Sequence, residues 1–257
     1  MSPRAVLLFD IDGVIRDVGG SYRRAIVETV QHYSGVRPEP SAIDSLKAEG
    51  CWNNDWDASL ELLRRGGLAE LPAFEALVEV FNGFYFGGDP EGDPGAWQGF
   101  IGTEPLLVEP SFFDELSGAG VAWGFVSGAE PPSARFVLEQ RLGLNNPPLI
   151  AMGDAPDKPD PTGFLRLAAE LSGGLGSGGL PVAYLGDTVA DVLTVQRARQ
   201  QQSAQTFLSL AVAPPHLQAP EAAERRSRYE AQLLEAGADA VIPNTTAVLT
   251  ALEQALP

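Results

Sequence analysis

The chain has 257 residues, of which 44% are hydrophobic and 20% charged, a composition typical of a folded globular protein. The formal net charge of −17 argues against non-specific binding to nucleic acid or to anionic membranes. The single cysteine, Cys51, excludes an intramolecular disulfide, and two histidines leave little room for a zinc site built on several histidines. Since no apolar run of about 18 residues and no apolar N-terminal segment after a basic start is present, we expect a cytoplasmic protein.

The first predicted element is a buried strand at 5–9, directly followed by the carboxylates of Asp10 and Asp12. Ligands of open parallel sheets bind at the carboxyl ends of the strands. Two acids at a strand end with one residue between them can share a hard cation. One can then attack as a nucleophile while the other moves a proton. An ordinary Asx-rich turn is the alternative. A calcium loop is not indicated, because Gly13 comes too early for that pattern.

Residues 18–98 predict a helical segment. Apolar side chains between Tyr22 and Tyr33 recur at helical spacing, and further helices are expected at 58–65 and after Pro72. The Gly-, Pro- and Asp-rich stretch 87–99 predicts a linker. Within the helical segment, a polar and aromatic loop is a candidate for substrate contact because aromatic faces and amide donors suit a sugar or polyol. Its residues are Trp52, Asn53, Asn54, Asp55 and Trp56. Packing of the two tryptophans within the protein is the alternative.

From residue 121 onward, short apolar strands alternate with helical stretches. The strands are expected at 121–126, 149–152, 182–185, 207–213 and 239–242, and the helices near 131–142, 162–171, 189–200, 220–236 and 245–256. Continuous apolar strands alternating with helices predict a parallel sheet covered on both faces. We therefore expect an α/β protein with a three-layer Rossmann-like core at 1–17 and 99–257. The helical segment 18–98 is then an insertion after the first strand.

Three further strand ends carry polar residues. Ser127 and Gly128 follow the strand at 121–126, where a hydroxyl and backbone N–H groups can hold a phosphoryl oxygen. Lys158 lies between prolines after the next strand and could neutralise a phosphate and an aspartate. Asp187 ends the strand at 182–185, and Asp191 falls on the first turn of the following helix, where acidic residues also favour the helix dipole. Four strands thus end in groups suited to phosphate and cation binding.

In these motifs the chain resembles the haloacid dehalogenase superfamily, over nearly its whole length. The four motifs are DIDGV at 10–14, FVSGA at 125–129, the lysine of KPDP and GDTVAD at 186–191. The helical insertion is similar to the cap of the subfamily that contains many small-molecule phosphatases. The WNNDWD loop and the GDAPDKPDPTG stretch resemble an uncharacterised phosphatase branch of that subfamily.

The resemblance implies a role for each motif residue. Asp10 would attack phosphorus, and Asp12 would protonate the leaving oxygen and then activate water. Ser127 and the Gly128 N–H would bind the phosphoryl group, and Lys158 would offset its charge. Mg²⁺ would bind Asp10, the Asp12 backbone carbonyl and Asp187, with Asp191 supporting this set or ligating through water. The substrate would be a small phosphorylated metabolite, and nucleic acid and membranes are not expected partners.

Several alternatives to a phosphatase stay open or are disfavoured. A phosphomutase of the beta-phosphoglucomutase type keeps Asp12 and is the first alternative. Haloacid dehalogenases proper lack the second aspartate, so Asp12 argues against carbon–halogen cleavage. Phosphonate hydrolysis would replace that residue and add a cap lysine; Asp12 is kept and Lys47 is the only lysine of the helical segment, so this alternative is disfavoured. A non-enzymatic binding protein would be expected to lack a motif residue, and none is missing. Arg16 could touch a second anionic group, although we expect it at the surface.

Overall fold

The computed structural model describes residues 3–49, 52 and 54–255, so Cys51 and Asn53 lie outside the described residues. The chain divides into two compact units, Met1–Asp17 with Leu106–Pro257 (unit 1) and Val18–Pro105 (unit 2). The second boundary lies beyond the expected position at 98/99. The reason is local: the Gly99 N–H donates to the Phe86 carbonyl, and Phe100 stacks on Phe84 with ring centroids 6.4 Å apart.

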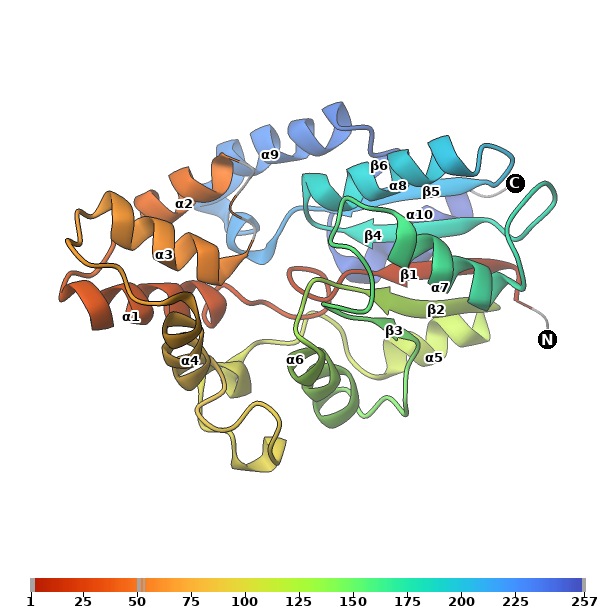
Figure 1. Ribbon diagram of the computed structural model, residues 1–257. Coiled ribbons are helices and arrows are strands. Elements are labelled where there is room, and N and C mark those ends of the chain that lie inside the picture. Colours follow the sequence, from red (N-terminus) through yellow and green to blue (C-terminus); the bar gives the residue numbers. More distant parts are fainter. Residues whose placement is uncertain (1–2, 50–51, 53, 256–257) are drawn as a thin grey trace. The chain divides into compact units, whose positions relative to one another are not determined.

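Unit 1 contains a six-stranded parallel sheet in the order β3-β2-β1-β4-β5-β6 (Figure 1). The strands are β1 (Ala5–Phe9), β2 (Val121–Val126), β3 (Leu149–Ile150), β4 (Val182–Gly186), β5 (Phe207–Val212) and β6 (Ala240–Ile242). The pairs β1–β2, β1–β4, β2–β3, β4–β5 and β5–β6 are all parallel. Because β1 lies between β2 and β4, the carboxyl ends of these three strands meet at the same edge of the sheet.

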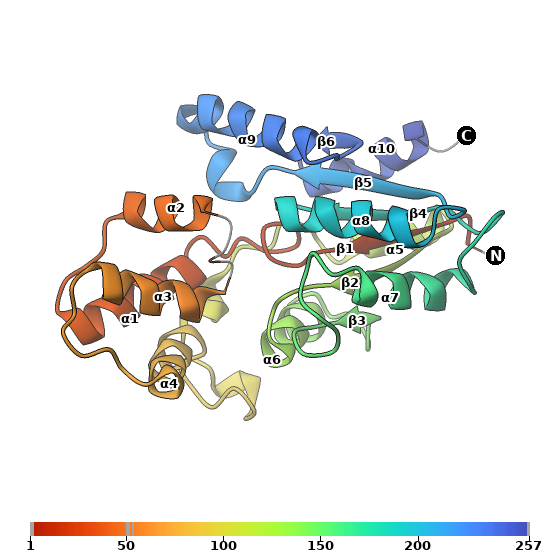
Figure 2. The same cartoon turned by 45° about the horizontal axis from the view of Figure 1, so that its top comes forward.

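Helices cover both faces of this sheet (Figures 1 and 2). They are α5 (Ser111–Gly118), α6 (Pro131–Arg135) with a π-helical continuation (Phe136–Arg141), α7 (Thr162–Ser172), α8 (Val189–Gln201), α9 (Ala223–Glu235) and α10 (Val248–Ala255). In β1, Leu7 and Phe9 pack with α5, α6 and α10, whereas Val6 and Leu8 pack with α7 and α8. This alternation explains why β1 is apolar at every position. The predicted α/β class with a parallel sheet between helical layers is confirmed.

The third predicted strand is shorter than expected. The ladder between β2 and β3 pairs Phe125 with Leu149 and Val126 with Ile150, and β2 ends there. Beyond that point, the Met152 N–H donates to the Ala129 carbonyl. The prediction of a strand to residue 152 was therefore wrong, because an apolar run at a sheet edge can extend beyond the end of the strand with which it pairs.

Unit 2 is helical. Its helices are α1 (Tyr22–Ser34), α2 (Pro40–Ala48), α3 (Asp55–Arg65) and α4 (Phe74–Tyr85). Helix α1 contacts α3 and α4, and an aromatic cluster lies among them. Tyr22 stacks on Tyr85 with ring centroids 4.3 Å apart, and Trp56 meets Phe81 edge-on at 6.5 Å. Aromatic side chains thus supply much of the small core of this unit.

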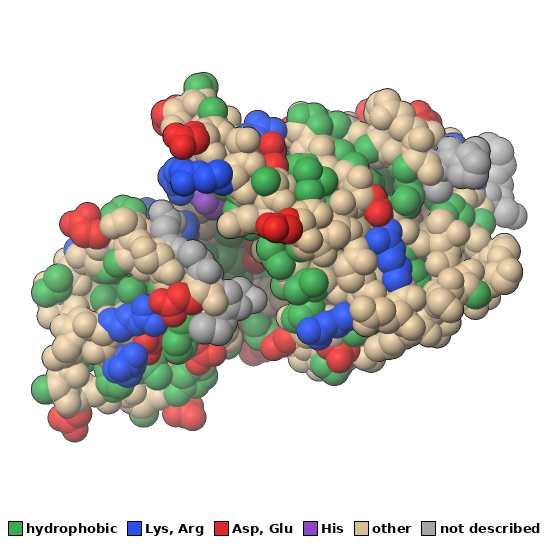
Figure 3. All heavy atoms as spheres, turned by 90° about the horizontal axis from the view of Figure 1, so that it is seen from above, with side chains coloured by type: hydrophobic (Ala, Val, Ile, Leu, Met, Phe, Trp, Pro, Cys, Tyr) green, Lys and Arg blue, Asp and Glu red, His purple; other side chains and the backbone are tan. Residues whose placement is uncertain are grey.

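The surface carries charges of both signs. Figure 3 shows Asp and Glu side chains scattered among Lys and Arg side chains over one face, with larger uncharged areas between them. On that face the net charge is therefore not gathered into one acidic surface. Among the described residues, no helix combines the length and apolar character needed to cross a bilayer.

Candidate active site

The site begins at the end of β1. Asp10 continues the ladder, since its N–H donates to the Leu185 carbonyl of β4 at 2.9 Å. Its side chain is 7% exposed, and Oδ1 accepts a hydrogen bond from the Ile11 N–H at 2.8 Å. The Lys158 ammonium lies 2.9 Å from Oδ2. Asp10 is therefore a buried, oriented carboxylate with a cation on one oxygen.

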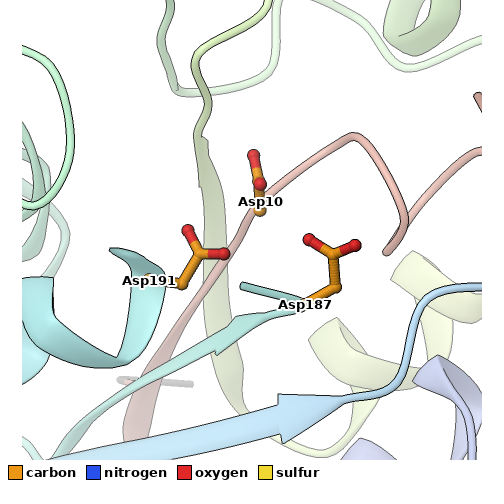
Figure 4. A group of neighbouring side chains, drawn as sticks. All are labelled: Asp10, Asp187 and Asp191. Carbon is orange, nitrogen blue, oxygen red and sulfur yellow. The ribbon is translucent and has the colours of Figure 1, made fainter. Parts of the chain in front are cut away.

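Two further carboxylates converge on Asp10. Asp187 follows β4 directly, and Asp191 lies in the first turn of α8. One carboxylate oxygen from each of the three residues lies within 4.8 Å of the others, and Figure 4 shows the three groups gathered around one point. All three side chains are buried. Acids that follow two separate strands, β1 and β4, thus lie together, as the sequence analysis expects.

Asp191 has its carboxylate oxygens occupied by protein donors. Oδ1 is 2.6 Å from the Lys158 ammonium and 3.1 Å from the Tyr184 hydroxyl. Oδ2 accepts from the N–H and the hydroxyl of Thr188, at 3.0 and 2.6 Å. Thr188 and Asp191 form a capping box at the start of α8. Because both of its oxygens already accept hydrogen bonds, Asp191 is better suited to orient Lys158 than to ligate a metal directly.

Tyr184 is a site residue that the sequence analysis did not single out. It lies in β4, is 1% exposed, and its hydroxyl is 2.7 Å from the Val126 carbonyl. The same hydroxyl lies 3.3 Å from the Lys158 ammonium. It therefore connects the residue before Ser127 to Lys158 and to Asp191. A tyrosine in the middle of an apolar strand is expected to be a core residue, and the sequence held no signal for this contact.

Burial and like charges govern the electrostatics of the site. Burial raises the pKa of Asp10 to about 6, against the lowering effect of Lys158. Burial, followed by the charges of Asp191 and Asp10, raises the pKa of Asp187 well above its usual value. Burial alone would lower the pKa of Lys158, but Asp10 and Asp191 raise it well above the usual value. The site therefore holds three carboxylates and one ammonium, which contacts Asp10 and Asp191, and it is short of positive charge.

The donor set fits a hard divalent cation. Among the described residues, none donates a hydrogen bond to the Asp187 carboxylate, although the residue is buried, with 8% exposed. A buried carboxylate without donors is costly unless a cation compensates it. Carboxylate oxygens are the ligands that Mg²⁺ and similar cations prefer. The cluster of Asp10, Asp187 and Asp191 could therefore hold a divalent metal.

Gly13 explains how the loop after β1 comes close to this cluster. It has φ +75°, a conformation that favours glycine. A Cβ atom at this position would lie 2.0 Å from Oδ2 of Asp187. The absence of a side chain therefore lets the backbone next to Asp12 lie against the Asp187 carboxylate.

Ser127 and Gly128 follow β2 beside a small depression. Ser127 is 6% exposed, and its Oγ accepts a hydrogen bond from the Ala129 N–H at 3.2 Å. Both residues line the depression together with Lys158 and the loop that precedes it. A hydroxyl, a glycine N–H and an ammonium thus border one hollow, an arrangement suited to an anion.

Asp12 lies on the exposed side of this group, with its side chain 28% exposed, and Arg16 Nε lies 2.7 Å from Oδ1. Arg16 itself is fully buried. The expectation that Arg16 is a surface residue was wrong, because Asp12 and the Ser133 hydroxyl give its guanidinium partners inside unit 1. The spacing Asp-x-x-x-Arg after a strand was the only sequence signal for this pair.

The candidate substrate residues of unit 2 have partners within that unit. The Trp52 indole N–H donates to Glu49 at 2.9 Å. Asn54 caps α3 by accepting from the Trp56 and Asp57 N–H groups. Asp55 pairs with Lys47 at 2.5 Å, and Trp56 packs edge-on against Phe74 and Phe81. Contact with a substrate stays a prediction for these residues.

Comparisons with known proteins agree with this arrangement. A family model of haloacid dehalogenase-like hydrolases matches residues 5–199. The chain therefore belongs to the haloacid dehalogenase-like hydrolases, and the predicted family is confirmed. An imidazoleglycerol-phosphate dehydratase from Phytophthora nicotianae is 32% identical over 204 residues, which make up 77% of this chain and 42% of that protein. The match thus covers less than half of that curated relative.

Two solved structures share the fold. Phosphatase Tt82 from Thermococcus thioreducens is 22% identical with a TM-score of 0.61, over 79% of this chain and 92% of that one. A beta-phosphoglucomutase from Clostridium difficile is 16% identical with a TM-score of 0.59, over 99% of this chain and 96% of that one. At these identities the likeness concerns the fold alone.

Proposed function

We propose that the protein is a magnesium-dependent phosphatase that hydrolyses a small phosphomonoester through an aspartyl-phosphate. The observation that carries this proposal is the surroundings of Asp10, whose carboxylate lies 2.9 Å from the Lys158 ammonium and has an oxygen within 4.8 Å of one on the donor-poor carboxylate of Asp187. A nucleophile in contact with an ammonium and next to a cation site suits attack on an anionic phosphate, because phosphoryl transfer depends on positioning and charge compensation. Family membership supports the same reading.

The residues divide the chemistry in two half-reactions. In the first, an Asp10 oxygen forms a bond to phosphorus while the bond to the ester oxygen breaks, and Asp12 gives its proton to that oxygen. In the second, a water oxygen attacks the same phosphorus, Asp12 takes the water proton, and Asp10 is released with inorganic phosphate. Ser127 and Lys158 hold the phosphoryl oxygens throughout. Unit 2 is, in this proposal, the cap that shields the site from bulk water.

The direct metal ligands would be Asp10, Asp187 and the backbone carbonyl of Asp12. When bound, Mg²⁺ would supply the positive charge that the three buried carboxylates lack and would polarise a phosphoryl oxygen. Asp191 would support this set by holding Lys158, because its oxygens accept hydrogen bonds from Lys158, Tyr184 and Thr188.

The substrate class would be a phosphorylated small alcohol, such as a sugar or polyol phosphate. The compound named in the Phytophthora relative, imidazoleglycerol phosphate, is itself a phosphomonoester of a polyol. It therefore belongs in any panel of trial substrates beside hexose phosphates, glycerol phosphate and phosphoglycolate.

The test is phosphate release from this panel with and without Mg²⁺, using Asp10→Asn as the control. Release that requires both the metal and Asp10 would support the proposal. Release by Asp10→Asn at the wild-type rate would contradict the role of Asp10. Exchange of phosphorus between two positions of a sugar phosphate, without net release, would instead indicate a phosphomutase of the beta-phosphoglucomutase type. Binding of Mg²⁺ with neither activity would favour a binding protein.

A further inference from the structure

Arg16 is the largest fully buried side chain of those that the structure describes, and it lies directly behind Asp12. Its Nε is 2.7 Å from Asp12 Oδ1, and Nη2 donates to the Ser133 hydroxyl at 2.8 Å. Its backbone carbonyl accepts from the Gly13 N–H at 2.9 Å, and the residue forms a β-bridge with Leu106. Backbone and guanidinium are therefore both held, and the side chain has little freedom to move with Asp12.

The two carboxylate oxygens of Asp12 have different surroundings. Oδ1 accepts the hydrogen bond from Arg16, whereas no described residue donates to Oδ2. The Asp12 side chain is 28% exposed and that of Arg16 is 0% exposed, so the pair has a buried end and an accessible end. A guanidinium that is fixed by other contacts orients a carboxylate better than a flexible ammonium would.

We propose that Arg16 is the positioning residue for Asp12, holding Oδ1 so that Oδ2 is the oxygen that delivers and later receives the proton. The inference rests on the proposed phosphatase function. In the first half-reaction the Oδ2 proton moves to the ester oxygen as its bond to phosphorus breaks. In the second, Oδ2 takes a proton from the water that attacks phosphorus, which restores Asp12 and releases phosphate. Arg16 itself touches neither substrate nor phosphorus.

The role predicts a dependence on the leaving group that a merely structural role would not produce. p-Nitrophenolate leaves as a stable anion and needs no proton, whereas the alkoxide of glycerol phosphate does. Proton transfer by a positioned group contributes about 10²–10⁴-fold to rate. Arg16→Met should therefore lower kcat/KM for glycerol phosphate by about 10²-fold and kcat/KM for p-nitrophenyl phosphate much less. Because the second half-reaction also needs Asp12, p-nitrophenyl phosphate should give a burst of one p-nitrophenolate per enzyme, followed by slow turnover.

Two milder variants keep the test valid if Arg16→Met does not fold. Arg16→Lys keeps the charge but loses the fixed fork, and Ser133→Ala removes one contact of the guanidinium while leaving Asp12 untouched. Both should show the same bias against glycerol phosphate, to a smaller extent. Arg135→Met is the matched control, because Arg135 lies in the same helix as Ser133 but its side chain is 59% exposed and pairs with Glu139.

The outcomes separate the inference from the function on which it rests. Selective loss with the poor leaving group and a burst with the good one would support the inference. Equal loss for both esters, or no loss, in folded Arg16 and Ser133 variants of an active wild-type enzyme would overturn it. Failure of the wild-type enzyme to release phosphate from either ester would overturn the proposed function and this inference together.

Discussion

Gly13 lies so close to Asp187 that a Cβ atom on the glycine would be 2.0 Å from the carboxylate oxygen Oδ2. The two residues come from loops that are far apart in sequence, one after β1 and one after β4. The backbone beside Asp12 thus fits against a carboxylate that we assign to the metal, and the spacing between them leaves no room for a side chain.

The substitution Gly13→Ala should reduce metal affinity and activity together. The alanine would have to adopt φ near +75°, which costs about 1–3 kcal/mol, and would displace the Asp187 carboxylate. We expect Mg²⁺ affinity, measured by titration calorimetry, to fall by about 10–100-fold, as for other changes that disturb ligand orientation. Gly118→Ala is the control, since a Cβ atom there meets nothing within 4 Å. Unchanged affinity in Gly13→Ala would mean that Asp187 does not bind the metal.

The substitution Asp187→Asn should stabilise the metal-free protein while abolishing activity. Burial, followed by the charges of Asp191 and Asp10, raises the pKa of Asp187 in the folded state well above its ordinary value of 3.8. Folding therefore takes up a proton above about pH 4, and stability falls as the pH rises through the folded-state pKa. Asparagine removes the cost of burying this charge, so the Tm of the metal-free variant should exceed that of wild type at pH 7. The expected rise is about 2–4 °C for each kcal/mol gained in the free energy of unfolding.

The pH dependence provides the control for this measurement. Below about pH 3, where the carboxyl group is mostly protonated in both folded and unfolded chains, the two proteins should unfold at nearly the same temperature. With saturating Mg²⁺ at pH 7 the order should reverse, because the metal stabilises only the chain that binds it. A metal-free Asp187→Asn protein that is less stable than wild type at pH 7 would show that Asp187 has a compensating partner.

The substitution Lys158→Met should destabilise the fold as well as prevent turnover. Lys158 lies 2.9 Å from Asp10 and 2.6 Å from Asp191, and removing one partner of a buried ion pair costs about 3–5 kcal/mol. Its loss would raise the folded-state pKa of both carboxylates, so the cost should be largest near neutral pH and shrink on acidification. Urea unfolding at pH 5 and pH 7 measures both effects.

The other lysine of the chain, Lys47, offers a matched comparison. It pairs with Asp55, and both side chains are partly exposed, at 27% and 23%. Lys47→Met should therefore cost about 1 kcal/mol or less. Equal costs for the two substitutions would contradict the special position of Lys158.

The substitution Tyr184→Phe should lower kcat with little effect on the fold. It removes only the hydroxyl that connects the Val126 carbonyl to Lys158 and Asp191. Loss of such a bond costs about 1–2 kcal/mol, so a comparable loss in the transition state would lower kcat by about 5–30-fold. Tyr33→Phe is the control, because its hydroxyl donates to the Ala76 carbonyl in unit 2. A lower free energy of unfolding in Tyr184→Phe with an unchanged kcat would mean that Tyr184 has a structural role only.

Local patterns predicted the strands well, and three-dimensional contacts explain what they missed. The runs at 5–9 and 121–126 match β1 and β2, because apolar runs in a buried parallel sheet have clear ends. Residues 151–152 fell outside β3 because the partner strand ends first, a property that no single strand reveals.

The same limit applies to the site. The acids of the first and last motifs stand out because polar residues follow apolar strands, and Asp10, Asp187 and Asp191 do lie together. The burial of Arg16 and the polar contacts of Tyr184 were missed because average exposure predicts an arginine at the surface and a strand tyrosine in the core. Their actual surroundings depend on pairings with Ser133 and Val126, residues that are distant in sequence.

The central place of β1 in the sheet also constrains how the chain can fold during synthesis. Residues 5–9 must pair with 121–125 on one side and with 182–185 on the other. The strand that carries the proposed nucleophile is among the first segments to be made, yet its second neighbour emerges roughly 180 residues later, long after Val18–Pro105 has the contacts to form its own compact unit. Until that second neighbour is made, β1 is an apolar strand without one of its partners, and the incomplete chain is therefore the stage most exposed to aggregation and to chaperone binding.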